Sequence, residues 1–215
     1  MTRSPSLRDL LTILYRPGET MRRILDSGEH RWSVEVVVLA FACASVNDAY
    51  RLDEALPGLK LLPTLAIVAL SIVVGAAAWV VTLFIMSWIA TPIGRILGGT
   101  GTVADVRAAL GWGMAPIVWS AIYRVPLAIL MSEFHIGSQT NTRQVFLDFV
   151  AHGGCSIIIL YLGFQLLFAI WSFVVGCFTL AEAHRFSAEK GFVNLAIAIA
   201  LPLLVIASAV FTFRR

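Results

Sequence analysis

The most constraining feature of the sequence is a pair of long apolar runs between Leu62 and Met131, joined by a glycine-rich turn at Gly94–Gly101. A helix needs about 20 mostly apolar residues to cross the roughly 30 Å hydrocarbon layer of a bilayer. Inside lipid the backbone has to satisfy its own hydrogen bonds, which restricts such runs to helices or closed barrels. The pattern therefore predicts a helical membrane hairpin.

The rest of the chain has the same character. Hydrophobic residues make up 59% of the 215 residues and charged residues only 13%, against about 45–50% and about 25% in soluble domains. We predict an all-α, polytopic integral membrane protein, a bundle of five transmembrane helices that occupies residues 32–215. The expected spans lie at about 32–46, 62–90, 108–131, 151–180 and 192–213.

Residues 1–31 are more polar and are predicted to form short interfacial helices on the cytoplasmic side. In the first helix the leucines at positions 7, 10, 11 and 14 form one apolar stripe, which Pro17 ends. Thr20 is the expected cap of a second short helix. Amphipathic helices of this kind lie in the headgroup layer of a membrane. A partner-binding helix or a loosely ordered tail is the alternative interpretation.

The glycine-rich turn is interpreted as structural. A phosphate-binding loop needs a lysine followed by serine or threonine after the second glycine, and it needs a preceding β-strand. Neither the lysine pair nor the strand is expected here. Thr102 and Asp105 instead have the spacing of a capping box, and Asp105 suits the positive end of a helix dipole. A proline inside the next run is expected to bend it. The predicted structural positions are Gly98, Gly99, Gly101, Thr102, Asp105 and Pro116.

Few polar residues lie inside the runs, and Arg124 and Gln165 are the clearest. A charge in lipid is costly, so Arg124 is expected either to snorkel or pair structurally, or to face a cavity as a functional cation. Asp48 is a hypothetical partner, since both groups belong to the outer side. Strictly additive losses of stability for Arg124→Ala and Asp48→Ala would contradict that pair.

Three further polar residues stand at the ends of runs. Asn47 closes the first expected span beside Asp48, on the outer side. Glu182 and His184 end the fourth span at its cytoplasmic mouth. They are interpreted either as a proton-titrating gate or simply as the polar end of a helix. Together with Arg124 and Gln165, these residues are the candidate intramembrane sites.

Several functional classes are disfavoured by what the sequence lacks. It contains no GxSxG and no HExxH motif, and its histidines and cysteines lack metal-ligand spacing. A net charge of +3 without a basic patch disfavours nucleic-acid binding. We therefore expect no enzymatic activity, no cofactor and no metal.

The distribution of basic residues predicts the orientation. Ten lysines and arginines belong to the N-terminal region, the glycine turn and the turn before the last span. The two opposite loops and the C-terminus hold five. Basic residues favour the cytoplasmic side. This places the N-terminus in the cytoplasm and the C-terminus outside, in the periplasm if the membrane is a bacterial inner membrane.

Several short motifs resemble the Yip1 domain family, specifically its bacterial members. The resemblance rests on Pro17, Thr20 and Ile24 at the entry, on Gly98–Thr102 leading to Gly111–Pro116, and on Trp171 and the turn His184–Ser187. It implies a multi-pass protein of the bacterial inner membrane. Eukaryotic members are Golgi and ER membrane proteins linked to Rab GTPases, but their longer N-terminal region is not recognisable here, so Rab binding is not carried over.

These observations favour a non-enzymatic membrane scaffold or adaptor that acts through helix packing. Its expected partners are the lipid bilayer and other membrane proteins or a second copy of itself. The alternative is a small channel or permease with a polar cavity near Arg124. An enzyme acting on lipids would lack a nucleophile or metal set. Solute flux in liposomes would distinguish the first two functions.

Overall fold

The computed structural model describes residues 7–28, 32–45, 64–126 and 154–213, and within them every regular element is a helix. The all-α prediction is therefore confirmed. Residues 121–126 are also helical and follow α7. The helices are α1 (Leu7–Tyr15), α2 (Pro17–Asp26), α3 (Trp32–Ser45), α5 (Thr64–Ile96), α6 (Val103–Gly113), α7 (Ala115–Trp119), α10 (Gly154–His184) and α11 (Ala188–Phe213).

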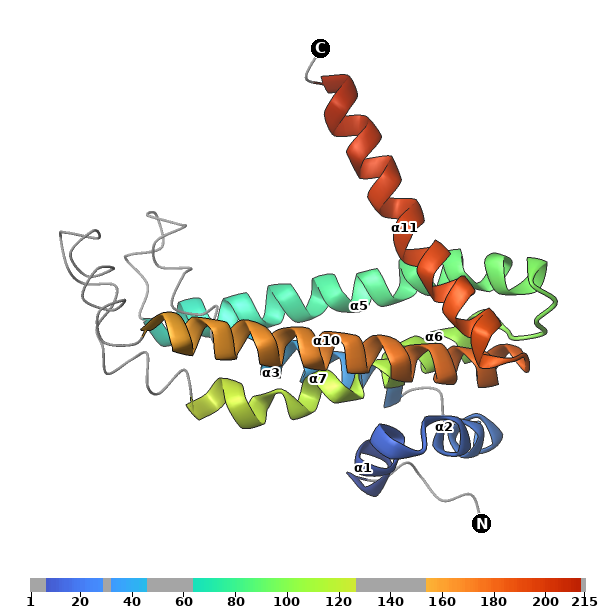
Figure 1. Ribbon diagram of the computed structural model, residues 1–215, viewed down its shortest axis with the longest axis horizontal. Coiled ribbons are helices and arrows are strands. Elements are labelled where there is room, and N and C mark those ends of the chain that lie inside the picture. Colours follow the sequence, from blue (N-terminus) through green and yellow to red (C-terminus); the bar gives the residue numbers. More distant parts are fainter. Residues whose placement is uncertain (1–6, 29–31, 46–63, 127–153, 214–215) are drawn as a thin grey trace.

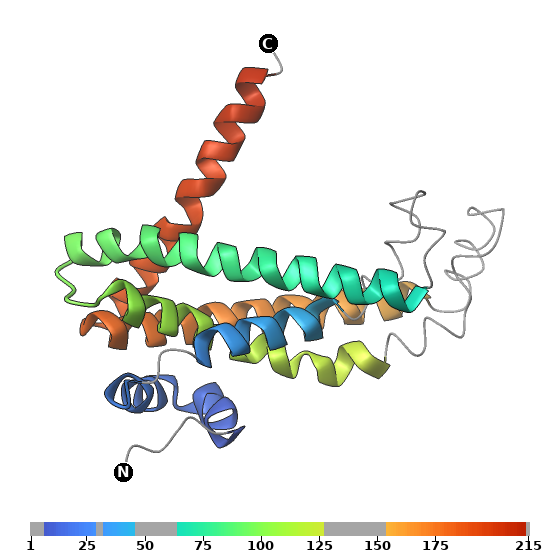
Figure 2. The same cartoon turned by 180° about the vertical axis from the view of Figure 1, so that it is seen from behind.

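Two long helices, α5 and α10, form the frame of the molecule (Figures 1 and 2). Helices α3, α6 and α7 pack along them, and α10 contacts α6, α7, α11 and α2. The N-terminal helices α1 and α2 lie against one side of this bundle. Helix α11 begins packed against α10 and α5, and its C-terminal half points away from the bundle (Figure 1).

Three described helices are long and apolar enough to cross a membrane: Ile72–Ile96, Ile159–His184 and Ala188–Thr212. They match the second, fourth and fifth expected spans. The expectation of five spans is not supported in the described part of the chain, where three helices meet this criterion. Helix α3 has 14 residues, which at 1.5 Å per residue is roughly 21 Å. It is therefore shorter than the hydrocarbon layer of roughly 30 Å.

The expected third span is not a single helix. Helix α6 ends at Gly113, Met114 caps it, and Pro116 stands in the first turn of α7. A proline has no N–H to donate and fits the start of a helix, where that donor would be unused. Pro116 therefore begins a new short helix, and it does not merely bend a continuous one as the sequence predicted.

The glycines of the bundle let backbones touch. A Cβ on Gly191 of α11 would lie 2.3 Å from the carbonyl oxygen of Cys177 on α10, and one on Gly113 would lie 3.0 Å from the Cα of Gly176. On α6, a Cβ at Gly111 would lie 2.7 Å from the carbonyl oxygen of Ser33. Small residues are the usual means of close helix packing in membranes.

Gly75, inside the second expected span, also receives a neighbour. The ring of Phe41 on α3 lies directly over Gly75, where a Cβ would approach its Cζ to 1.9 Å. Phe41 also makes an edge-to-face contact with Trp79, with ring centroids 5.3 Å apart. Gly75 therefore provides the space in which α3 approaches α5.

The C-terminal ends of α5 and α10 adopt the same capping motif. At the end of α5, Gly98 has φ +90°, and Gly99 N–H bonds the carbonyl of Gly94. At the end of α10, Arg185 has φ +57°, and Phe186 N–H bonds the carbonyl of Ala181. Both are Schellman caps with a left-handed residue.

The predicted capping box is confirmed. Thr102 accepts a hydrogen bond from Asp105 N–H at 3.2 Å, and the Asp105 carboxylate accepts one from Thr102 N–H at 3.0 Å. The cap proposed at Thr20 is wrong, because α2 begins at Pro17 and Thr20 is fully buried within it. Its hydroxyl bonds that of Thr12 at 3.1 Å.

We predict that Gly191→Ala destabilises the protein by about 1–3 kcal/mol, because the new methyl group meets a backbone carbonyl that has no rotamer with which to move aside. The matched control is Gly163→Ala in α10, where a Cβ meets nothing within 4 Å. That change should be neutral or stabilising by up to about 1 kcal/mol. Unfolding in a detergent titration measures both, and equal losses would contradict the close-contact interpretation.

Candidate functional site

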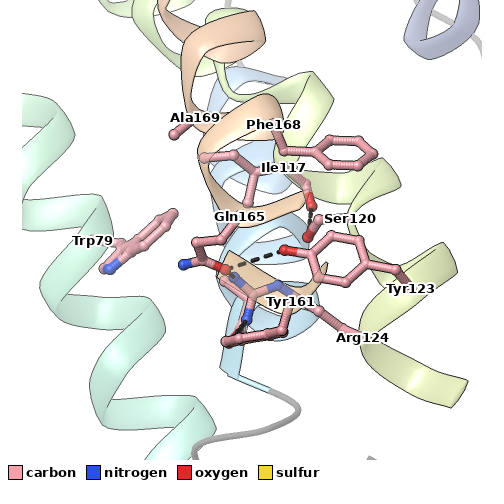
Figure 3. A pocket seen from close by; sticks show the side chains of 10 residues that line it. Trp79, Ile117, Ser120, Tyr123, Arg124, Tyr161, Gln165, Phe168 and Ala169 are labelled. Carbon is pink, nitrogen blue, oxygen red and sulfur yellow. Dashed lines mark hydrogen bonds between the residues drawn. The ribbon is translucent and has the colours of Figure 1, made fainter. Parts of the chain in front are cut away.

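The strongest candidate site surrounds Arg124, which lies in the helical segment after α7 and is only 5% exposed. One terminal nitrogen of its guanidinium donates to the carbonyl of Ala44 at 2.6 Å, near the end of α3. The other donates to the side-chain oxygen of Gln165 on α10. The first nitrogen also lies 3.5 Å from the hydroxyl of Tyr161. Arg124 thus ties two helices to its own (Figure 3).

Aromatic rings flank the guanidinium. Its central carbon lies 5.6 Å from the ring centroid of Tyr123 and 5.9 Å from that of Tyr161, within the range of cation–π attraction. The Tyr123 hydroxyl donates to the same Gln165 oxygen at 3.1 Å. Tyr123 in turn stacks on Phe164 and Phe168 of α10. The ring contacts hold Tyr123, and with it the polar cluster, against α10.

The positive charge of Arg124 has no carboxylate partner among the described residues. The ion pairs found there join arginines 16, 22 and 23 to acidic residues of the N-terminal helices and α10. The Nε atom of Arg124 is buried and has no hydrogen-bond partner in the described part of the chain. Burying a guanidinium without a counter-ion is costly in a low-dielectric interior. Among the described residues, this charge meets neutral oxygens and aromatic rings only.

A cavity of about 240 Å³ lies beside the guanidinium, lined mainly by α10 and by α7 with the segment after it, and also by one residue each of α3 and α5. Since one water molecule occupies about 30 Å³ of liquid, the space admits a small polar group. Figure 3 shows Gln165 between Trp79 and the tyrosines. The lining is otherwise mostly aromatic and aliphatic: Ala44, Trp79, Ile117, Ser120, Tyr123, Arg124, Tyr161, Gln165, Phe168 and Ala169.

The structure thus brings two of the candidate polar residues, Arg124 and Gln165, into direct contact. Asn47 and Asp48 lie outside the described residues, and the Arg124–Asp48 pair stays a prediction. Tyr123 and Tyr161 belong to the same cluster, although the sequence singled out neither as a site. The sequence could have indicated these two tyrosines, because both lie inside apolar runs and a buried tyrosine hydroxyl usually has a hydrogen-bond partner.

Glu182 and His184 lie toward the other end of α10 and face different neighbours. The Glu182 carboxylate accepts two hydrogen bonds of 3.1 Å from Arg22 on α2. His184 is fully buried, and its ring stacks on Phe186 with centroids 5.1 Å apart. The two side chains therefore serve two separate contacts, one to α2 and one to the turn after α5.

The glycine turn closes around the His184 imidazole. A Cβ would lie 2.2 Å from Nε2 at Gly94 and 3.0 Å from Nδ1 at Gly101, while at Gly99 it would lie 2.7 Å from the Cβ of His184. The N–H of Thr100 donates to the His184 carbonyl at 3.1 Å. These contacts explain why Gly94, Gly99 and Gly101 lack side chains, because only glycine leaves room for the ring at these positions. Gly98 does not contact the ring and is instead the left-handed residue of the α5 cap.

Two tryptophans that sequence reasoning did not assign to a contact anchor the N-terminal helix. The indole N–H of Trp119 donates to the carbonyl of Leu10, and that of Trp171 to the carbonyl of Leu14, each at 3.2 Å. Both bonds join α1 to the bundle. No cluster of three or more possible metal ligands occurs among the described residues.

We predict that His184→Ala costs about 2–5 kcal/mol of stability, as removal of a fully buried ring leaves a cavity. Glu182→Gln should cost less than about 1 kcal/mol, because its partner Arg22 is largely exposed. Unfolding in detergent measures both variants. Equal, non-additive losses in the two variants and their double mutant would indicate a coupled pair, as a proton gate requires.

Comparison with known proteins identifies a family. The family described as Yip1 domain matches residues 11–210, which is nearly the whole chain. The comparisons with curated proteins and with solved structures found no match.

Proposed function

This chain belongs to the Yip1 domain family, as the match over residues 11–210 shows, and we propose that it is a non-enzymatic membrane scaffold or adaptor. The family and the three long apolar helices establish a membrane protein. The proposal beyond this is that the protein works by holding a partner at the membrane, and not by chemistry or transport.

The observation that carries the proposal is the docking of α1 and α2 on the bundle. Leu10, Ile13, Met21 and Ile24 belong to the buried core together with residues of α6 and α10. The two indole bonds and the Arg22–Glu182 pair add polar links between these helices and the bundle. An anchored N-terminal layer provides a rigid surface for a partner.

The outer side of this layer is charged. Arg16 and Glu19 form an exposed pair, with side chains 65% and 71% accessible. Arg8 is exposed as well, and the side chains of Arg22 and Arg23 remain 70% and 61% accessible despite their carboxylate partners. Exposed charges of both signs suit the recognition of a protein surface, to which they contribute specificity.

The topology we propose keeps the N-terminus in the cytoplasm and the C-terminus in the periplasm of a bacterial inner membrane. In it, α3 and the α6–α7 segment complete two further crossings as short or broken elements. Broken helices are tolerated at membrane depth where protein surrounds them, and α6 is enclosed by α3, α5 and α10. The basic residues of α1, α2 and the turns support this orientation.

A second candidate function is a small channel or permease. The cavity beside Arg124 and Gln165 favours it, because a polar space inside an apolar bundle is what such a protein requires. Against it, the half of the bundle around His184 is closely packed, with Leu180 and His184 fully buried.

The test uses a photo-crosslinking amino acid at position 8 in native membranes. We expect a reproducible partner whose yield falls several-fold in the double variant Trp119→Phe/Trp171→Phe, since each lost indole bond costs about 1 kcal/mol and frees α1. Trp88→Phe is the matched control, because Trp88 is 72% exposed and faces away from the protein.

The same proteins reconstituted in liposomes supply the contrary outcome. A scaffold gives no solute flux above protein-free vesicles. The permease would be supported by a specific solute flux with two properties. Arg124→Gln would abolish this flux, and the tryptophan variants would leave it unchanged. Such a result would overturn the scaffold proposal. Crosslinking to no protein in native membranes would also overturn the scaffold.

A further inference from the structure

We propose that the Arg124 cavity is a binding site for the phosphate headgroup of an anionic membrane lipid. The proposal is independent of the scaffold function, because it depends on Arg124 and Gln165, whereas other side chains, Trp119 and Trp171, hold α1. It rests on a charge with no counter-ion among the described residues, on free donors, and on the surroundings of the cavity.

The charge is the first argument. Arg124 is 5% exposed, carries a full positive charge, and meets only neutral acceptors among the described residues. Burying a guanidinium without a counter-ion is costly in a low-dielectric interior. An anion that enters the site would supply the negative charge that the described residues do not provide.

The donors are the second argument. A guanidinium has five N–H donors in a planar fork. Ala44 and Gln165 accept short bonds, and Tyr161 makes only a long contact at 3.5 Å. The Nε–H has no partner among the described residues. The unused donors match a phosphate group, which arginine binds through paired hydrogen bonds. The Tyr161 hydroxyl and the Ser120 side chain also line the space.

The surroundings select a lipid over a soluble anion. Next in sequence to the cavity-lining Tyr123 and Tyr161, Ile122 is 68% exposed and Leu162 is 57% exposed, so these helices also present apolar surface suited to acyl chains. Helix α3 ends at Ser45, one residue after the carbonyl that Arg124 binds, and the sequence then becomes polar at Asn47 and Asp48. This is the depth at which a chain leaves the apolar layer and at which headgroups lie.

Gln165 offers a way to fill the site from within. Its side-chain oxygen already accepts hydrogen bonds from Arg124 and Tyr123. Gln165→Glu keeps these acceptors and the side-chain size, and it adds a negative charge next to the guanidinium. If the site needs an anion, this built-in carboxylate should take the place of the lipid.

The experiment is native mass spectrometry of the purified full chain, with phosphatidylglycerol and phosphatidylcholine of identical acyl chains. We expect the wild type to retain one phosphatidylglycerol with about tenfold preference, equivalent to about 1.4 kcal/mol. Arg124→Gln and Gln165→Glu should both lose the preference, and Gln165→Glu should also unfold at a higher temperature. Arg107→Gln should keep it, since Arg107 lies elsewhere, 4.6 Å over the ring of Phe84.

Three results would overturn the proposal. One is equal retention of the two lipids by the wild type. Another is an unchanged preference in Gln165→Glu, a variant that preserves the hydrogen bonds and so does not depend on how well Arg124→Gln folds. The third is displacement of phosphatidylglycerol by millimolar inorganic phosphate, which would assign the site to a soluble anion.

Discussion

Direct contact between helix backbones is the constraint on which the rest of this structure depends. In lipid, apolar surface gives helices little reason to associate, so close packing and interhelical hydrogen bonds have to hold them. Glycines at positions 113, 176 and 191 bring α6 and α11 against α10. At that separation Thr179 reaches the carbonyl of Ala109 at 2.9 Å, and Ser172 reaches that of Gly113 at 2.7 Å. The polar links follow from the close approach.

This packing divides the bundle into two unlike halves. Around His184 the chain is dense, and the turn after α5 encloses a buried imidazole with glycines. Around Arg124 the helices leave a cavity, and a guanidinium is held there by neutral oxygens. Glu182 in the dense half binds α2, while Trp119 and Trp171 bind α1, and this docking supports the scaffold proposal. The open half holds a charge with no counter-ion among the described residues, which supports the lipid proposal. Both proposals therefore derive from one uneven distribution of packing.

The features that sequence predicted well are local ones. Helix capping by Thr102 and Asp105 depends on residues three positions apart, so their spacing alone indicated it. The long apolar runs appear as α5, α10 and α11 for a similar reason, because length and composition decide whether a helix can span lipid. The errors concern positions where helices begin, because more than one residue there could have set the boundary. Pro116 began a new helix where a bend was expected, and Pro17, not Thr20, began α2.

The sequence by itself determined that this protein is helical and membrane-embedded, since no soluble core accommodates such apolar runs, and its motifs indicated the family. Only the tertiary structure decided what the polar residues do. From the sequence, Arg124 could snorkel, pair or face a cavity. The structure surrounds it with Ala44, Gln165 and Tyr161 from distant positions and with its neighbour Tyr123. It likewise separated Glu182 from His184 by directing them to different helices. Such contacts depend on helix rotation and close approach, which no local pattern encodes.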